Sequence, residues 1–277
     1  MKNADMNVVR GFGDEWSRFD QSALPDHERT AIFESYFAVF PWHELSDDSI
    51  GADFGCGSGR WALMVAPRVG TLHCVDASAE ALAVARTSLA RLPNVHFFEA
   101  TVGQLPFDTD SLDFAYSLGV LHHVPDITAA LRECVRCLKP GAPFLLYLYY
   151  AFGNRGLGFR AVWRASDLVR RVVSRLPHPA RYAVSQALAA LVYIPLARGS
   201  ALLERAGMNV DGIPLSFYRD KTLYTMRTDA LDRFGTRIEQ RFTRSQMMEL
   251  MKDGGLENIV FSEHTPYWCA VGYKADA

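Results

Sequence analysis

The sequence predicts an α/β fold in which a mostly parallel sheet is covered by helices on both faces. Strand and helix patterns alternate with short connections over residues 49–150, and a glycine-rich turn at 55–59 joins the first strand to the first helix. Hydrophobic residues make up 49% of the 277 residues and charged residues 22%, as in ordinary globular proteins. This length suits one large domain with an insertion, or two small domains.

Residues 1–47 precede the first strand. The segment 11–19 places two glycines beside three aromatic residues, which predicts a segment that stays mobile until it packs against something. A helical pattern begins at Pro25, and its apolar face predicts a helix docked at the edge of the sheet.

The alternating region should supply the core of the sheet. Five strands are expected at residues 50–54, 71–76, 95–100, 112–117 and 143–150. Three helices are expected at residues 60–68, 78–91 and 127–138. Ligands of such sheets bind beyond the carboxyl ends of the strands. Four polar residues fall at these ends, namely Asp53, Asp76, Thr101 and Ser117.

Residues 151–240 interrupt the alternation with a helical stretch rich in arginine. We interpret its arginines as a solvated helix face, with an acidic substrate group or a membrane surface as the alternatives. They are Arg160, Arg164, Arg170, Arg171, Arg175 and Arg181. Afterwards Thr243 is the expected N-cap of a last helix, and residues 256–262 and 267–273 read as two final strands.

The turn at 55–59 has the character of a ligand site. Alternating glycines let a ligand lie against bare backbone, and the following helix N-terminus offers free N–H donors. Asp76 ends the second strand 21 residues after Gly55, where a carboxylate can accept hydrogen bonds from both hydroxyls of a ribose. Arg60 stands where the dinucleotide fingerprint has its third glycine, which disfavours a nicotinamide dehydrogenase.

With these residues the chain resembles the class I methyltransferases that use S-adenosylmethionine, of the small-molecule, methyltransferase type 11-like kind. The resemblance covers roughly residues 48–150 and returns weakly at 241–273. The segments that carry it are 53–59, 75–76, 105–107, 113–123 and 138–141. It implies a Rossmann-like, seven-stranded sheet whose last strand is antiparallel, with a helical lid inserted before the sixth strand.

The resemblance also implies a division of the chain by role. Residues 1–47 would form an N-terminal arm and helix, and residues 48–150 the core that binds S-adenosylmethionine. Residues 151–240 would form the lid or substrate insertion, and residues 241–277 the rest of the core.

The resemblance assigns cofactor contacts for S-adenosylmethionine and its product, S-adenosylhomocysteine. The glycine turn would approach the methionine part and the ribose, and Asp53 would orient the glycines or pair with the cofactor's ammonium. Asp76 would hold the ribose, unless it is only a helix N-cap, and Thr101 would face adenine, unless it is an ordinary turn residue. The expected contacts are Asp53, Gly55, Cys56, Gly57, Gly59, Asp76, Ala77, Thr101, Val102, Ser117 and Leu118.

The acceptor side is expected beyond the fourth and fifth strands. His123, ahead of His122, is the candidate that takes a proton from the acceptor, although one of the two could simply buttress the loop. The expected pocket residues are Trp16, His122, Tyr147 and Tyr149. In this family an aromatic arm can exclude water from the cofactor, and here its side chains would be Phe12, Trp16 and Phe19.

Cys134 and Cys137 form a Cys-x-x-Cys pair without a second pair or a histidine at ligand spacing, so we expect core packing rather than zinc, and no metal. Two other activities are weighed. A nucleic-acid methyltransferase is disfavoured because residues 117–120 lack its motifs and the chain has no basic excess. A protein that binds S-adenosylmethionine without turnover is the other alternative.

Charge and cysteine content suggest the setting. The net charge of −2 does not favour nucleic acid or an anionic membrane, and five cysteines without framework spacing favour a reducing compartment. The N-terminus lacks a signal-peptide pattern. The longest apolar run, 187–197, is shorter than the ~20 residues that span a bilayer, so no transmembrane segment is expected. We therefore expect a cytoplasmic monomer or homodimer that acts on a small molecule.

Overall fold

The computed structural model describes residues 2–152, 156–210 and 212–276. The chain forms two compact units. The core unit comprises Met1–Ser22, Arg29–Ala151 and Ile238–Ala277, and the helical unit comprises Ala23–Glu28 and Phe152–Arg237. The assignment of an arm, a cofactor-binding core and a lid to parts of the chain stays a prediction.

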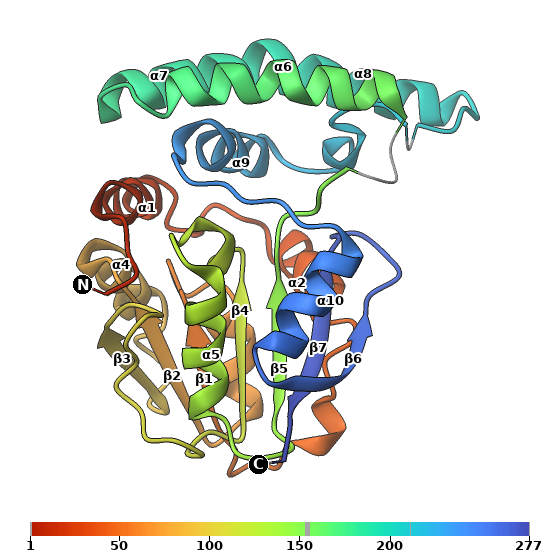
Figure 1. Ribbon diagram of the computed structural model, residues 1–277. Coiled ribbons are helices and arrows are strands. Elements are labelled where there is room, and N and C mark those ends of the chain that lie inside the picture. Colours follow the sequence, from red (N-terminus) through yellow and green to blue (C-terminus); the bar gives the residue numbers. More distant parts are fainter. Residues whose placement is uncertain (1, 153–155, 211, 277) are drawn as a thin grey trace. The chain divides into compact units, whose positions relative to one another are not determined.

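The core unit contains the predicted seven-stranded sheet, in the order β3-β2-β1-β4-β5-β7-β6 (Figure 1). β7 alone runs opposite to the other six strands, which confirms the predicted fold class. The strands are β1 Ile50–Phe54, β2 Thr71–Asp76, β3 Val95–Glu99, β4 Phe114–Leu118, β5 Pro143–Tyr147, β6 Leu256–Phe261 and β7 Cys269–Lys274.

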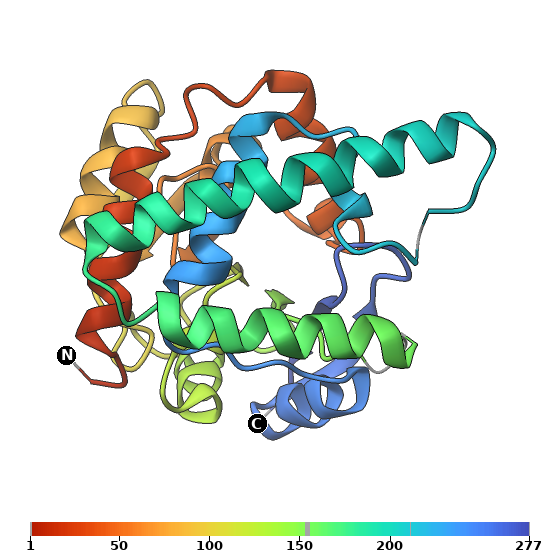
Figure 2. The ribbon, with the colours of Figure 1, turned by 90° about the horizontal axis from the view of Figure 1, so that it is seen from above.

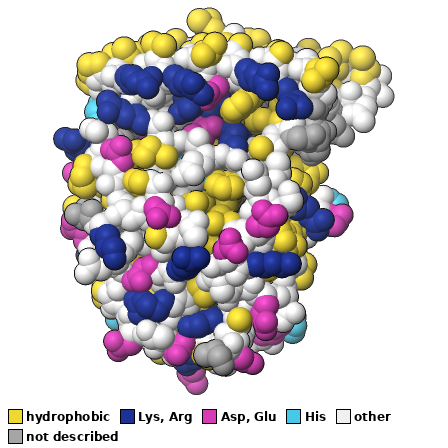
Figure 3. All heavy atoms as spheres, viewed as in Figure 1, with side chains coloured by type: hydrophobic (Ala, Val, Ile, Leu, Met, Phe, Trp, Pro, Cys, Tyr) yellow, Lys and Arg dark blue, Asp and Glu magenta, His cyan; other side chains and the backbone are white. Residues whose placement is uncertain are grey.

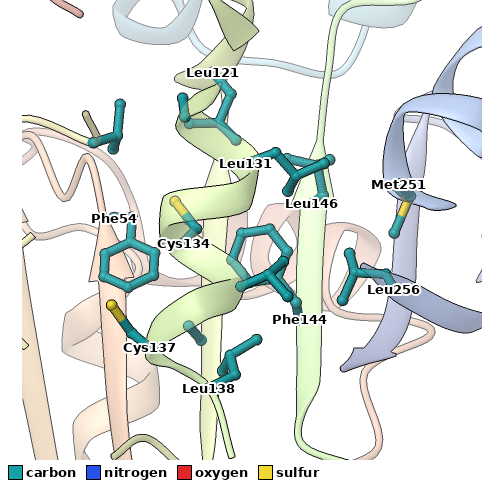
Figure 4. Packing of buried hydrophobic residues seen from close by; sticks show 14 of the residues in the cluster. Phe54, Leu121, Leu131, Cys134, Cys137, Leu138, Phe144, Leu146, Met251 and Leu256 are labelled. Atoms are coloured by element: carbon teal, nitrogen blue, oxygen red, sulfur yellow. The ribbon is translucent and has the colours of Figure 1, made fainter. Parts of the chain in front are cut away.

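Helices cover both faces of this sheet. One face packs against α5 (Ile127–Cys137) and α10 (Arg244–Asp253), and the other against α2 (Asp26–Tyr36), α3 (Ala62–Val65) and α4 (Ala79–Ser88). Figure 4 shows Cys134 and Cys137 among the apolar side chains of the first layer, and both side chains are buried. The predicted packing of this cysteine pair in the core is therefore confirmed.

The N-terminal segment differs from the prediction, because it forms a helix, α1 (Met6–Arg18). Asp5 caps this helix by accepting a hydrogen bond from the backbone N–H of Asn7. Gly13 permits close approach to α4, since a Cβ atom there would lie 2.6 Å from Ser78 Oγ. Gly13 thus serves the packing of α1 on α4.

The fifth strand is shorter than predicted and ends at Tyr147. Beyond it the backbone pairs with Phe242: the Phe242 N–H donates to the Tyr149 carbonyl, and the Ala151 N–H donates to the Phe242 carbonyl. The last helix has the predicted Thr243 cap, completed by Gln246 as a capping box.

The helical unit is built from α6 (Leu157–Val173), α9 (Leu223–Gly235) and one long helix. That long helix, which we call the 178–205 helix, joins α7 (His178–Leu188), a π-helical turn (Ala189–Tyr193) and α8 (Ile194–Arg205). Figures 1 and 2 together show α6 and the 178–205 helix in one layer, with α9 beneath them. The apolar core of this unit includes Val173, Ala189, Tyr193, Ala197, Met226, Ala230 and Phe234.

Two of the arginines in this unit are buried, contrary to the predicted solvated face. Arg170 Nε donates to Asp167 Oδ1 at 2.8 Å, and its Nη1 donates to the Thr236 carbonyl at 2.9 Å. Arg181 is 6% exposed. The Arg170 guanidinium ties α6 to the end of α9, whereas Arg160, Arg164, Arg171 and Arg175 are exposed.

The structure also changes the expectation about membrane-spanning length. The 178–205 helix has 28 residues and a mean hydropathy of 1.4 over its most apolar window, which is long and apolar enough to cross a membrane by length and composition alone. The sequence-based expectation rested only on the uninterrupted apolar run at 187–197. The helix is longer than this run, because it continues through polar residues on either side. Only 22% of that window is buried.

Candidate functional site

The glycine turn after β1 adopts a backbone that other residues rarely adopt. Gly55, Gly57 and Gly59 have φ values of 87°, 53° and 79°. The turn is also crowded: a Cβ atom at Gly57 would lie 2.7 Å from Trp16 Nε1, and one at Gly55 would lie 2.3 Å from Val120 Cγ2. Glycine is therefore required here both by the backbone conformation and by the close approach of neighbouring side chains.

Asp76, at the end of β2, is hydrogen-bonded to this turn. Its Oδ2 accepts from the Gly57 N–H at 2.9 Å, and its Oδ1 accepts from the Ser78 N–H at 2.9 Å. Burial raises the pKa of Asp76, while these backbone donors oppose the shift. Ser78, not Asp76, caps α4 with its side chain. The carboxylate is thus held at the carboxyl edge of the sheet, beside the glycine turn and Ala77.

Asp53 lies one residue before the end of β1 and is fully buried. Within the described part of the chain, neither of its carboxylate oxygens has a hydrogen-bond partner. Burial raises the pKa of Asp53 well above its usual value; the nearby Tyr116 hydroxyl opposes this shift, and the neighbouring Asp76 adds to it. A buried carboxyl group without partners is costly, so this position suits a ligand that brings a donor or a positive charge.

The N-terminal segment 2–18 is bonded to the same edge of the sheet. Thr101 Oγ1 donates to the Lys2 carbonyl at 2.8 Å, and Asn3 exchanges two hydrogen bonds with the backbone of Asp126, of 2.6 and 2.8 Å. Helix α1 packs on α4, and its Trp16 lies against Gly57. The hydroxyl of Thr101, expected near adenine, is thus bonded to the arm, and Val102 beside it is buried.

The side chains at the end of β4 are buried in the sheet. Ser117 is fully buried, and its hydroxyl donates to the Phe54 carbonyl at 2.8 Å, which joins β4 to β1. Leu118 is also buried. Cys56, in the glycine turn, is buried too, and its neighbour Cys74 and burial raise the pKa of its thiol well above the usual value.

Both histidines lie in a 3₁₀ turn after β4 (Leu121–His123) and are buried. His123 Nδ1 donates to the Ile238 carbonyl at 2.6 Å, so Nε2 is the basic nitrogen of the neutral ring. Phe12 of α1 lies over His123, with ring centroids 5.1 Å apart. Burial lowers the pKa of His122 well below its usual value, and His123 and Arg241 add to the shift.

An aromatic cluster surrounds His122. Its ring centroid is 3.9 Å from that of Tyr149 and 6.5 Å from that of Tyr147. Burial raises the pKa of Tyr147 well above its usual value, so its phenol is neutral at physiological pH. The structure therefore brings together three of the four expected pocket residues, while Trp16 lies at the glycine turn instead.

Sequence reasoning missed two members of this cluster. Tyr36 packs edge-on against Tyr147, with centroids 4.9 Å apart, although its helical spacing indicated only a packing face. Arg241 lies over the Tyr149 ring at 5.0 Å, and its Nε pairs with Glu239 at 2.7 Å. No local pattern marks Arg241, because the whole helical insertion separates it from β5. Among the residues that the structure describes, no group of three or more His, Cys, Asp or Glu side chains could hold a metal ion.

Comparison with known proteins gives the family. Residues 52–146 match a family described as a methyltransferase domain. The chain is 32% identical over 155 residues to a 2-phytyl-1,4-naphthoquinone methyltransferase of Trichormus variabilis, a match covering 51% of this chain and 68% of that protein. This chain belongs to the class I methyltransferases.

Two further likenesses agree. The methyltransferase YcgJ of Bacillus subtilis, which is uncharacterized, is 39% identical over 102 residues, covering 36% of this chain and 40% of YcgJ. The matches thus span about two fifths of the length of YcgJ and about two thirds of the length of the Trichormus protein. A solved complex of a methyltransferase with the Trm112 methyltransferase activator of Haloferax volcanii has a TM-score of 0.57, with 17% identity and 98% of both chains covered. At that identity the likeness shows the fold.

Proposed function

We propose that this methyltransferase uses S-adenosylmethionine and methylates a small-molecule acceptor. The observation that carries the proposal is the joined pair of Asp76 and the glycine turn at the carboxyl edge of the sheet. When bound, S-adenosylmethionine supplies an electrophilic methyl group. S-adenosylhomocysteine is the product that this reaction would leave.

The described residues fit this cofactor. Asp76 Oδ2 accepts a backbone hydrogen bond from Gly57 and Oδ1 one from Ser78, and a carboxylate has about four acceptor positions, which leaves capacity for ribose hydroxyls. The two partnerless oxygens of Asp53 suit the ammonium of the methionine part. The bare backbone of the glycine turn would approach that part, and Thr101 and Val102 would contact adenine.

His123 is the residue that we propose as general base. Its hydrogen bond to the Ile238 carbonyl fixes the ring and makes Nε2 the atom that receives the proton from an acceptor hydroxyl. His122 is the weaker candidate, because its lowered pKa disfavours the protonated form. His122 would instead help to position Tyr149 and His123, with which it packs.

We propose a quinone-type aromatic ring, in its reduced hydroxyl form, as the acceptor. The name of the Trichormus relative supports this class. The cluster of His122, Tyr147 and Tyr149 supports it as well, because flat side chains pack well against a flat ring. Closure of the site by the N-terminal arm and a helical lid is part of the proposal. In the chain, the insertion begins directly after these tyrosines.

Turnover with labelled S-adenosylmethionine and a panel of reduced naphthoquinones tests the function. We expect a labelled methyl ether or ring-methylated product, together with one equivalent of S-adenosylhomocysteine. His123→Gln should lower kcat by about 100-fold or more, the usual contribution of a general base, with a smaller effect on KM.

The matched control is His96→Gln, because His96 is exposed on β3. This variant should retain the wild-type kcat. Full activity of His123→Gln would contradict the assignment of His123 as general base. Methyl transfer to nucleic acid instead of the quinones would overturn the proposed substrate class.

A further inference from the structure

Helix α6 has three distinct sides. The side toward the rest of the helical unit is buried and includes Asp167, Arg170 and Val173. A second side is apolar and exposed: Leu157, Leu168 and Val172 are 82%, 64% and 65% exposed. A soluble helix normally turns polar residues outward, so this apolar side is unexplained by packing within the unit.

A third side of α6 is basic. Arg160, Arg164 and Arg171 follow one another at intervals of four and seven residues, which places them together along the flank of the apolar side. All three are exposed. Arg171 also pairs with Asp167 at 2.9 Å while remaining 61% exposed. Arg175 extends this row just beyond the helix and donates to the Arg171 carbonyl.

The 178–205 helix continues the apolar surface. Its exposed residues include a series at intervals of three or four, namely Ala180, Ala183, Ala187 and Leu191. Leu191 is 76% exposed and Leu202 is 64% exposed. Arg198 interrupts the series, but its guanidinium donates to the carbonyls of Arg219 and Lys221.

The two helices lie in one layer, so their exposed apolar sides form one surface of the helical unit (Figures 1 and 2). We call it the apolar face and define it by Leu157, Leu168, Val172, Leu191 and Leu202. Figure 3 shows hydrophobic side chains over α6, α7 and α8 of the helical unit, with a row of Lys and Arg side chains directly beside them.

We propose that the apolar face docks on an anionic phospholipid membrane. Residues 156–207 contain eight arginines, all exposed except Arg170 and Arg181, and only two acidic residues, Asp167 and Glu204, in a chain whose net charge is −2. Apolar side chains flanked by arginines are the pattern of helices that lie in the membrane interface, where the apolar side enters the lipid and the cations meet its phosphates. The overall charge of the chain conceals this local complementarity.

The contacts of the 178–205 helix favour lying on the membrane over crossing it. Its other side packs in the core of the unit through Ala189, Tyr193 and Ala197. Gln186 accepts from Arg227 Nε, and Tyr182 accepts from Arg227 Nη2 at 2.9 Å. Crossing a bilayer would break these contacts and leave polar groups without partners in lipid.

Co-sedimentation of the full chain with vesicles tests the proposal. We expect binding to vesicles of phosphatidylcholine mixed with phosphatidylglycerol, weaker binding to phosphatidylcholine alone, and loss of affinity as salt is raised. Leu168→Glu and Leu191→Glu should each weaken binding by about tenfold or more. Arg160→Gln and Arg164→Gln should each weaken binding to the anionic vesicles by about fivefold.

The matched control is Val260→Glu on β6, where Val260 is 52% exposed in the core unit. It should bind vesicles as the wild type does. Because all the substituted side chains are exposed, thermal unfolding should show that every variant is folded. Vesicle binding needs no methyl donor or acceptor, so its failure is distinguishable from failure of the proposed reaction.

Three outcomes would overturn the proposal. The first is absence of binding to the anionic vesicles, or equal binding by wild type and Leu168→Glu. The second is a homodimer in light scattering that Leu168→Glu and Leu191→Glu convert to monomer, because a second copy would then cover the face. The third is protein that alkaline carbonate does not release from the vesicles, because the helix would then cross them.

Discussion

At the scale of single residues, the candidate site is marked by buried polar groups that the fold alone does not satisfy. Within the described residues, both oxygens of Asp53 and both ring nitrogens of His122 lack hydrogen-bond partners. Such groups cost stability, and they are commonly found where a ligand or a reaction requires them. The site therefore has consequences that stability measurements can detect without any substrate.

His122 should make the protein sensitive to mild acid. Its pKa is lowered by burial, so the unfolded chain binds a proton below about pH 6.5 while the folded chain does not. The free energy of unfolding should therefore fall as the pH falls from 6.5 toward the folded-state pKa. The contribution is up to about 1.4 kcal/mol per pH unit. Urea unfolding of wild type and His122→Phe across this range measures it.

In His122→Phe this part of the decline should be missing, because the ring stays but no longer titrates. His27→Phe is the control, since His27 is exposed on α2, and this variant should keep the decline that the wild type shows. Parallel pH dependence of His122→Phe and wild type would contradict the assignment.

At the scale of elements, the arm formed by residues 2–18 is attached to the carboxyl edge of the sheet at separate points. The hydroxyl of Thr101 holds the Lys2 carbonyl, Asn3 bonds to Asp126, and Trp16 lies against Gly57. Helix α1 itself packs on α4. Loss of one polar tether should therefore loosen the arm without unfolding the sheet.

Thr101→Val should speed hydrogen exchange in α1 by about fivefold, the equivalent of one hydrogen bond worth about 1 kcal/mol. Exchange in β1 and β4 should stay as in the wild type. Thr87→Val is the matched control, because its hydroxyl donates to the Ala83 carbonyl within α4. Unchanged exchange in α1 of Thr101→Val would show that the tether does not hold the arm.

At the scale of the whole molecule, local sequence patterns predicted the fold because the patterns and the structure coincide. β1 and β2 have the predicted bounds, since each is a short apolar run that ends at a turn or an acid. The predicted end of β5 was wrong, because the backbone beyond Tyr147 pairs with Trp268 and Phe242, which are distant from it in sequence. The buried Arg170 was missed for the same reason: its acceptors lie near residue 236.

The candidate site divides in the same way. The glycine turn and Asp76 could be predicted because their chemistry follows from spacing along neighbouring strands. Tyr36 and Arg241 could not, because only the folded sheet brings them to Tyr147 and Tyr149. The cytoplasmic location stays a prediction, and the individual cofactor contacts stay predictions until a ligand is bound.

Calorimetric titration with S-adenosylhomocysteine tests the central claim most directly. Asp76→Asn should weaken binding by about tenfold or more, because a charged hydrogen-bond acceptor for the ribose is lost. Asp113→Asn is the matched control, since Asp113 also accepts from a backbone N–H, that of Ile50, at the opposite end of the strands. We predict wild-type affinity for Asp113→Asn. Equal affinity of Asp76→Asn and wild type, or no binding by the wild type, would contradict the account.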